Sequence, residues 1–237
     1  MPEKDRMELL EKQLAKTGAE LRAFTFEMRA KQDEEHGKFV EGVPIVFDQK
    51  TDIAGWWEEI VDRGALDKTD LTDVRFLVNH NTDMVPLARS RNNTKNSTMQ
   101  MTVEEDGMKI RVNLDTENNS EARNLYSAIE RGDVSGMSFM FTVRGDKWDN
   151  LDTDYPTRHI TDIEKVYEVS AVTFPAYEQT SINARSREKL ESTRATLESA
   201  KAEARKAEEE AKQRADRMKL ESEERGRKLA LLEFETN

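Results

Sequence analysis

Three histidines and two neighbouring serines are the residues of this chain that could form a hydrolytic site. A histidine is the usual general base near neutral pH, because its unperturbed pKa lies there. His36 lies in the charged segment KQDEEHGK, which is typical of a solvated turn, and His159 begins a strand without an apolar setting. His80 instead ends the alternating apolar pattern of VRFLVNHN. From the residues alone, a structural histidine and a catalytic histidine both fit this position.

The serines Ser135 and Ser138 lie in GDVSGMSFMF, a segment that reads as a strand. Alternation places Met137, Phe139 and Phe141 on one face, which must be the buried one, and Ser138 on the other. A nucleophile needs a fixed backbone and a hydroxyl that can reach substrate. Ser138 meets this condition better than Ser135, although an ordinary serine on an exposed strand face also fits the pattern.

Glu168 in VYEVSAVTF is the third unusual residue. It has the same parity as Val166, Val172 and Phe174, so its carboxylate is predicted to point toward the apolar side of a strand. A carboxylate there needs a partner to stay charged. An imidazole N–H would supply one, as in the orienting role of the acid in a catalytic triad. A glutamate that reaches solvent from a strand edge is the alternative.

The elements that must position these residues follow from periodicity and turn signals. Residues 3–17 form a short amphipathic helix ending at Gly18, and residues 24–28 alternate like a half-buried strand. KFVEGVPIVFD is a strand whose internal glycine indicates a bulge or bend. GWWEEIVDRGALDK is predicted to be a helix with Trp56, Trp57 and Ile60 inward and its end near Gly64.

The second half of the body is more regular. Residues 99–114 form a hairpin that turns at Asp106-Gly107, and Ser120 caps a helix that runs to about Arg131. The serine-bearing strand follows, and residues 159–174 supply one or two more strands. Residues 20–184 therefore predict an antiparallel α+β body of about seven strands with two helices.

Residues 185–237 have a different composition. They are rich in Ala, Glu, Lys and Arg, have no proline, and carry one glycine at 226. Their apolar heptad seam is thin, which favours a long solvated helix over a tight coiled coil. The chain thus divides into an N-terminal amphipathic helix (1–19), a body (20–184) and a charged helical tail (185–237).

Composition excludes several classes of protein. The chain has a net charge of −11. The tail holds 14 basic and 13 acidic residues, which leaves 23 basic and 35 acidic residues in residues 1–184, so this part of the chain is strongly acidic. Nucleic acid is therefore not an expected partner. No apolar run approaches the roughly 20 residues of a membrane span, and the N-terminus has no signal region. We expect a soluble, cytoplasmic protein.

The absence of cysteine and of any spacing typical of metal ligands speaks against a metal-dependent hydrolase, and no metal or cofactor is expected.

Six segments occur in an order that resembles a known family. They are FVEGVPIVFD, EEIVDRGALDK, VRFLVNHN, EEDGMKIRVNLD, IERGDVSGMSFMF and YEVSAVTFPAY. Together they resemble the tailed-bacteriophage prohead (procapsid maturation) serine proteases, relatives of the herpesvirus maturation protease, over about residues 20–184. The resemblance implies a mostly antiparallel β-barrel flanked by helices.

The resemblance also implies roles for the candidate residues. His80 matches the catalytic histidine of the family, Ser138 its nucleophile, and Glu168 the acidic residue before VS in the last motif. His159 remains a competitor for the third position, because the herpesvirus relatives use a second histidine there.

Two positions depart from the family pattern, and the oxyanion donors are open. Met140 and Ala88 stand where the family usually has glycine, and larger side chains there are expected to narrow the groove or displace a donor. Backbone amides, with an arginine such as Arg89 or Arg144, are the expected donors to the oxyanion.

The function implied by the resemblance is that of a serine endopeptidase. Its substrates would be scaffold or capsid-protein segments and the protease itself, inside the assembling procapsid in the host cytoplasm. We expect a homo-oligomer, such as a dimer. The alternative is a capsid-assembly or scaffolding protein that retains the protease fold without activity.

Overall fold

The structure is a computed structural model that describes residues 8, 12, 14, 16–24, 28–34, 37–53, 55–173 and 179–235. Of the last range it describes the backbone throughout and the side chains of 194–222 and 224–226.

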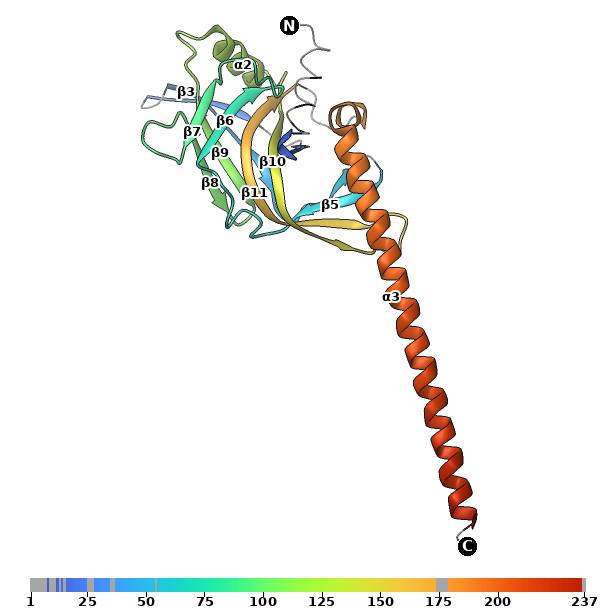
Figure 1. Ribbon diagram of the computed structural model, residues 1–237. Helices are drawn as coiled ribbons and strands as arrows, with labels where there is room; N and C mark the ends of the chain where they lie inside the picture. The colour runs from blue at the N-terminus through green and yellow to red at the C-terminus, as the bar shows by residue number, and fades with distance from the viewer. Residues whose placement is uncertain are drawn as a thin grey trace.

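The body consists of two open β-sheets (Figure 1). In the seven-stranded sheet the order is β1-β10-β11-β5-β4, with β6 also paired to β11 and β7 to β6. Its strands are β1 Glu20–Phe24, β4 Thr51–Ile53, β5 Trp57–Val61, β6 Asp73–Val78, β7 Ala88–Arg91, β10 Gly136–Asp149 and β11 Thr157–Val172. The second sheet has the order β2-β3-β9-β8. Its strands are β2 Arg29–Asp33, β3 Gly37–Val46, β8 Met99–Glu104 and β9 Gly107–Asn113.

The predicted α+β class with mostly antiparallel strands is confirmed, but the closed barrel is wrong. Among the residues that the structure describes, no strand pairs one sheet with the other, so both sheets stay open. The expected strand count was too low because short strands such as β4 and β7 carry too few residues to show a period.

The main hydrophobic core lies between the two sheets. Val40 and Ile45 of β3 and Phe139 and Phe141 of β10 are fully buried in it. The helix α2 (Ser120–Glu130) adds its buried face (Ala122, Leu125, Tyr126, Ile129) at one end of the sheets (Figure 1). The pairing of β3 with β9 is irregular between Gly42 and Ile45, as the internal glycine predicted. A side chain at Gly42 would collide with the Met137 sulfur, so this glycine brings the sheets together.

The two longest strands, β10 and β11, form a curved hairpin to which the rest of the first sheet is attached (Figure 1). Their register shifts at four points between Met140 and Asp146. The first part of β11 pairs in parallel with β5, and its last part pairs in parallel with β6. The bent hairpin therefore holds strands at both ends, and the candidate site lies at the end away from its turn, where β10 begins and β11 ends.

The segment predicted as a helix at Trp56 and Trp57 is wrong, because it forms strand β5 and a following turn. Trp57, Glu59 and Val61 alternate on the buried side. The alternation typical of a strand was not recognised in the sequence, because one of the three buried positions is occupied by a charged residue. This residue, Glu59, is only 3% exposed. Burial of this glutamate depends on ion pairs with residues distant in the sequence.

The other three predicted helices are present, and the last two have shifted ends. The described residues between 8 and 17 are helical, and Gly18 stops the helix with a φ of 67°. The N-cap of α2 is Asn119 rather than Ser120, since its side chain accepts from the amides of Glu121 and Ala122. The tail forms one helix, α3 (Gln179–Glu235), that begins before residue 185.

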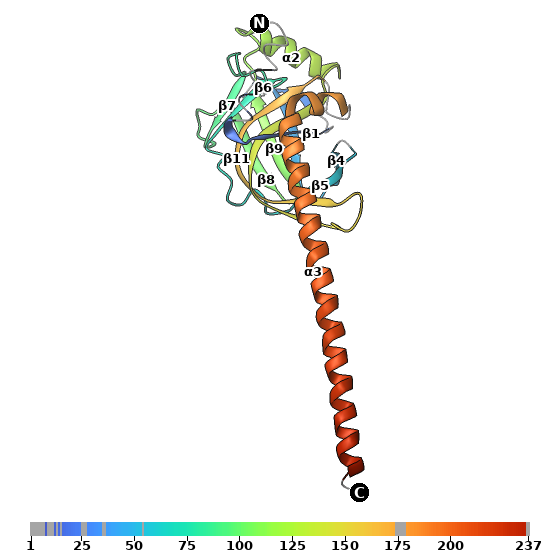
Figure 2. The same cartoon turned by 45° about the vertical axis from the view of Figure 1, so that its right-hand side comes forward.

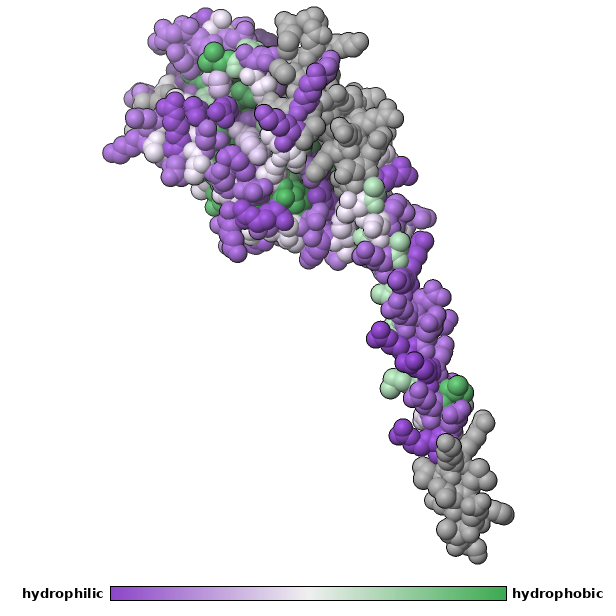
Figure 3. Space-filling model, in the orientation of Figure 1, coloured by the Kyte–Doolittle hydropathy of each residue, from purple (hydrophilic) through white to green (hydrophobic). Residues whose placement is uncertain are grey.

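Helix α3 touches the body near its N-terminal part and then extends away from it (Figures 1 and 2). Leu197 is buried, and the Arg194 guanidinium lies 4.9 Å from the ring centre of Trp56. Every residue from 202 to 222 is exposed, and the surface there is mainly hydrophilic (Figure 3). No described helix is long and apolar enough to cross a membrane.

Asp70 ties the start of β6 to β11, and this contact gives a pH-dependent prediction. Its carboxylate accepts from Lys165 and from the side chain and amide of Thr72, which hold the pKa of Asp70 well below its usual 3.8. A lowered folded-state pKa contributes stability above about pH 4 that is lost as the pH falls through the folded value. Asp70→Asn should therefore reduce the free energy of unfolding at pH 7, and the difference from the native chain should shrink toward pH 3.

Urea denaturation at both pH values measures this difference. Asp67→Asn, an exposed neighbour, controls for the loss of one negative charge. A deficit in Asp70→Asn that is as large at pH 3 as at pH 7 would contradict the assignment.

Candidate active site

His80 lies in a tight turn immediately after β6. Asn79 and His80 both have left-handed backbone conformations, with φ of 50° and 55°. The amide of Asn79 donates to the carbonyl of Ala171 (2.9 Å), so this turn is fixed against the end of β11. The prediction that His80 continues the apolar stripe of its strand is wrong. The two left-handed residues end the strand, and the imidazole reaches Glu168 on the other face of the sheet.

The His80 imidazole and the Glu168 carboxylate form a buried pair. The distance from Nδ1 to Oε1 is 2.5 Å, and both side chains are 3% exposed. An ionised carboxylate only accepts, so Nδ1 carries the proton and Nε2 is the nitrogen that can accept one. This is the tautomer that a general base needs when an acid orients it. Glu168 thus has the imidazole partner that the sequence led us to expect.

Glu168 reaches His80 because of a β-bulge. Met140 pairs with Glu168 and Phe141 pairs with Val166, so Tyr167 is the extra residue of β11. The bulge reverses the parity, and Val166 faces the core while Glu168 faces the opposite side. The expectation that Glu168 points toward the side of Val166 is therefore wrong. The carboxylate is buried for a different reason, since it lies on the face that also carries Ser138.

Ser138 is directly opposite Ser170 in the pairing of β10 with β11, and two positions from the Met140–Glu168 pair. Side chains of directly paired residues share a face, so Ser138 and Glu168 lie on the same side of the sheet. Ser138 itself is only 2% exposed, whereas the sequence predicted that it lies on an open face of the strand. Its hydroxyl donates to the carbonyl oxygen of Arg22 in β1 at 2.9 Å, rather than to the imidazole.

Ser170 is a site residue that the sequence analysis missed. It is fully buried, its hydroxyl donates to Glu168 Oε2 (2.5 Å), and its oxygen accepts from the amide of His80 (3.1 Å). Its position two residues after Glu168 was visible in the sequence. Its contact with His80 depends on the pairing of β11 with β6, which periodicity does not give.

The other candidate residues lie elsewhere. His159 is near the opposite end of β11, where its Nδ1 is 2.6 Å from Asp62 Oδ1. Ser135 is exposed just before β10 begins. His36 lies outside the described residues. The structure therefore brings Glu168, and not His159, to His80.

Both candidate oxyanion arginines are engaged with carboxylates. The Nε of Arg89 donates to Asp73 (2.6 Å), and Arg144 donates to Asp162 (3.2 Å). Neither contact assigns an oxyanion donor, and these residues remain predictions.

The two departures from the family pattern have packing explanations. Ala88 pairs with Phe76 and lies in the main core, so it does not line the face of Ser138. Met140 does lie on that face, where it packs against Leu14, Ala19 and Leu21. The larger residue at 140 thus supports the N-terminal segment.

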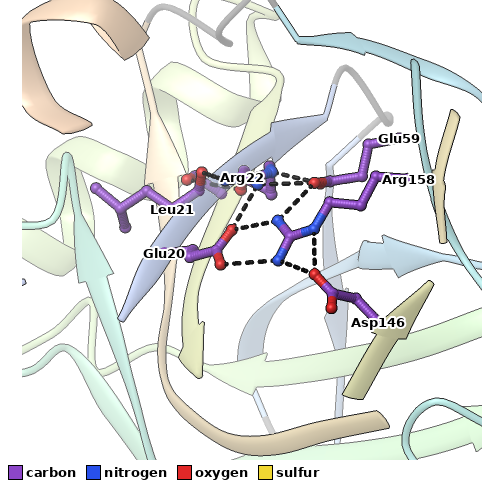
Figure 4. Close-up of polar contacts among 7 residues, drawn as sticks. Glu20, Leu21, Arg22, Glu59, Asp146 and Arg158 are labelled. Atoms are coloured by element: carbon purple, nitrogen blue, oxygen red, sulfur yellow. Dashed lines mark hydrogen bonds and ion pairs between the residues drawn. The ribbon is translucent and has the colours of Figure 1, made fainter. Parts of the chain in front are cut away.

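A buried ion cluster (Figure 4) holds β1, which pairs with β10 at Ser138. The Nη2 of Arg22 donates to Glu20 (2.6 Å) and to Glu59 (2.8 Å), and the Nη1 of Arg158 donates to the same two carboxylates (2.9 and 3.1 Å). Arg158 also contacts Asp146 (2.7 Å). Burial opposes the charge of Arg158, but Glu20 and Glu59 outweigh it and raise the pKa of this guanidinium above its usual 12.5. The Arg158 guanidinium therefore stays charged, and it contacts three carboxylates where Arg22 contacts two.

A sheet that presents a serine, a histidine and a carboxylate on one face has the side-chain types of a serine hydrolase. The family model for the caudovirus prohead serine protease matches residues 24–195, and the chain belongs to this family. Comparison with curated proteins gives no match. Among solved structures, the bacteriophage T4 capsid assembly protease gp21 aligns with 65% of this chain and 98% of its own, at 12% identity and a TM-score of 0.32.

The ion cluster predicts a large penalty for removing one of its carboxylates. Glu59→Ala leaves two buried arginines with one buried glutamate, and breaking such a pair typically costs about 3–5 kcal/mol. Glu58→Ala is the matched control, because Glu58 is the residue before Glu59 in β5. It pairs with the exposed Lys50, and ion pairs with an exposed partner contribute about 1 kcal/mol or less. Chemical denaturation of both variants measures the contrast. Equal free energies of unfolding would refute a stabilising role for the cluster.

Proposed function

We propose that the protein is a serine endopeptidase that acts during procapsid maturation, with Ser138 as nucleophile, His80 as general base and Glu168 as the group that orients the imidazole. The observation that carries the proposal is the buried His80–Glu168 pair on the face of Ser138, in a chain of the prohead protease family. Supporting evidence is the left-handed turn at His80, since strained backbone persists where surrounding contacts enforce it and is frequent at active sites.

In the reaction, His80 Nε2 removes the proton of Ser138 as Oγ attacks the scissile carbonyl, and it later donates that proton to the leaving amine. Glu168 stabilises the imidazolium that forms between the two steps. The Ser138 hydroxyl donates to the Arg22 carbonyl in the described arrangement. It must therefore rotate toward His80 before proton transfer.

The proposed substrates are scaffold or capsid-protein segments and the protease itself, inside the assembling procapsid. A non-catalytic assembly protein with the same fold is the competing function. The two differ in one respect, which is whether Ser138 reacts.

We expect Ser138→Ala and His80→Ala each to abolish proteolysis, with a loss of about 10⁶-fold in kcat where residual turnover is measurable. Mass spectrometry of the expressed chain detects self-cleavage, and labelling with an active-site serine reagent reports on Ser138 directly. Circular dichroism on the same samples checks that the fold is intact.

Two matched controls belong to this experiment. Ser135→Ala removes an exposed serine three positions away, and His159→Ala removes a histidine that also pairs with a carboxylate. Both should retain cleavage. Full activity in Ser138→Ala, or loss in His159→Ala alone, would exclude the proposed assignment, and an unlabelled, uncleaved native chain would favour the assembly protein.

The tail is proposed to be an assembly address that gathers the enzyme into the shell through weak contacts with helices of scaffold or capsid protein. Its exposed part is charged and carries few apolar residues, among them Met218 (71% exposed) and Leu220 (59% exposed). Such a surface cannot form a domain core but can add weak contacts that raise local concentration. Self-cleavage in YEQTSINARSREK would detach it, and since residues 179–189 are helical, the first turns of α3 would have to open.

Deleting residues 202–237 tests the address and leaves the docked residues Arg194 and Leu197 in place. Peptide cleavage in solution should be nearly unchanged, because residues 202–222 of the deleted part are all exposed, while incorporation into procapsids should fall. Incorporation is measured by the protease content of purified particles. Unchanged incorporation, or a collapse of activity in solution, would show that the tail has another role.

A further inference from the structure

We infer that Ser170 is a positioning residue of this site, which fixes the carboxylate of Glu168 and the backbone of His80 with one hydroxyl. The inference rests on the proposed function for its catalytic consequence. Its structural part, the contact itself, can be tested without any substrate.

The contacts form a closed ring. The His80 imidazole donates to Glu168 Oε1 (2.5 Å), the Ser170 hydroxyl donates to Glu168 Oε2 (2.5 Å), and the His80 amide donates back to Ser170 Oγ (3.1 Å). Both carboxylate oxygens are thereby engaged. The ring links the side chain of His80 to its own main chain, so the imidazole cannot move relative to Glu168 unless one of these bonds breaks.

The main-chain bond answers a specific need of His80. Strand β6 ends at Val78, and His80 follows in a left-handed conformation that is unfavourable for a residue other than glycine. Its amide is buried against β11 and needs an acceptor, because a buried unsatisfied N–H is costly. Ser170 supplies this acceptor and so stabilises the conformation that presents the imidazole to Glu168.

The position of Ser170 in the sheet makes this double contact possible. Ser170 pairs with Ser138 of β10 on one side and with Leu77 of β6 on the other. It therefore lies between the strand of the proposed nucleophile and the strand that leads to the proposed base. A small side chain with one donor and an acceptor oxygen satisfies both partners there, whereas alanine would leave the His80 amide and Glu168 Oε2 unsatisfied.

Ser170→Ala should lower kcat by about 10- to 100-fold with little change in KM, the range found for outer hydrogen-bond partners of metal-bound histidines. Ser90→Ala is the matched control, since Ser90 is equally buried and its hydroxyl both donates to and accepts from Asn93. The control should keep kcat within about twofold, the scatter expected for a change outside the site.

Proton NMR of the imidazole N–H groups provides a readout that a general loss of stability would not move. Only three histidines contribute, and His159, bonded to Asp62, is an internal reference. The His80 Nδ1 proton signal should shift or broaden in Ser170→Ala and stay in place in Ser90→Ala, while the His159 signal stays in both.

The Thr and Val variants at 170 keep the test decisive if the alanine variant does not fold. They have nearly the same shape and differ in the hydroxyl, so Ser170→Thr should retain more activity and the native His80 signal, and Ser170→Val should lose both. Equal kcat in the Thr and Val variants with an unchanged His80 signal would overturn the inference. If Ser138→Ala still cleaves, the proposed function fails instead, and the NMR comparison continues to decide the role of Ser170.

Discussion

The pairing of β10 with β11 is the constraint on which the rest of the structure depends. Strand β1 attaches to β10, while β5 and β6 attach to different halves of β11. One irregularity in this hairpin, the extra residue at Tyr167, decides which side chains face the core. Without the bulge Glu168 would lie on the face of Val166, in an apolar interior where an unpaired carboxylate is costly. With it, the carboxylate lies beside the imidazole that it needs, so a local defect in the ladder creates the charged pair of the site.

Arg22 connects this site to the electrostatics of the body. Its guanidinium lies in the buried ion cluster, and its carbonyl accepts the hydroxyl of Ser138 from the neighbouring strand. The family match begins at residue 24, so Glu20 and Arg22 lie outside it while Glu59, Asp146 and Arg158 lie within it. Without the arginine of β1, Glu59 would face Arg158 alone. The N-terminal strand thus adds one carboxylate and one guanidinium to the cluster, and their ion pairs with Arg158 and Glu59 explain how an edge strand of five residues is held beside Ser138.

The sequence predicted regular elements and residue types well, and it failed where distant residues change a local pattern. The hairpin at residues 99–114 and helix α2 follow from alternation, turn chemistry and capping, which are local signals. Strand β5 was mistaken for a helix because Glu59 occupies a buried position through arginines from β1 and β11. The expected contact of Glu168 with an imidazole is present, but the predicted faces of His80 and Glu168 were wrong, since neither the left-handed turn nor the bulge leaves a period in the sequence. Ser170 went unnoticed because its importance lies in a parallel pairing of strands far apart in the chain.

The contrast between the site and the tail bears on how such an enzyme would be controlled under the proposed function. Each member of the candidate triad makes a buried hydrogen bond, with Glu168 bonded to His80 and Ser170, and Ser138 bonded to the backbone of β1. The part of α3 beyond the docked residues is the opposite, a long helix whose residues 202–222 are all exposed. From residue 202 to residue 235 a helix extends about 50 Å at 1.5 Å per residue. A partner that binds near its end fixes the body within that distance, and this raises the effective substrate concentration without altering the site. Under the proposed function, the higher effective substrate concentration inside the shell then confines cleavage to the assembled particle. This control requires no change in the hydrogen bonds of the site.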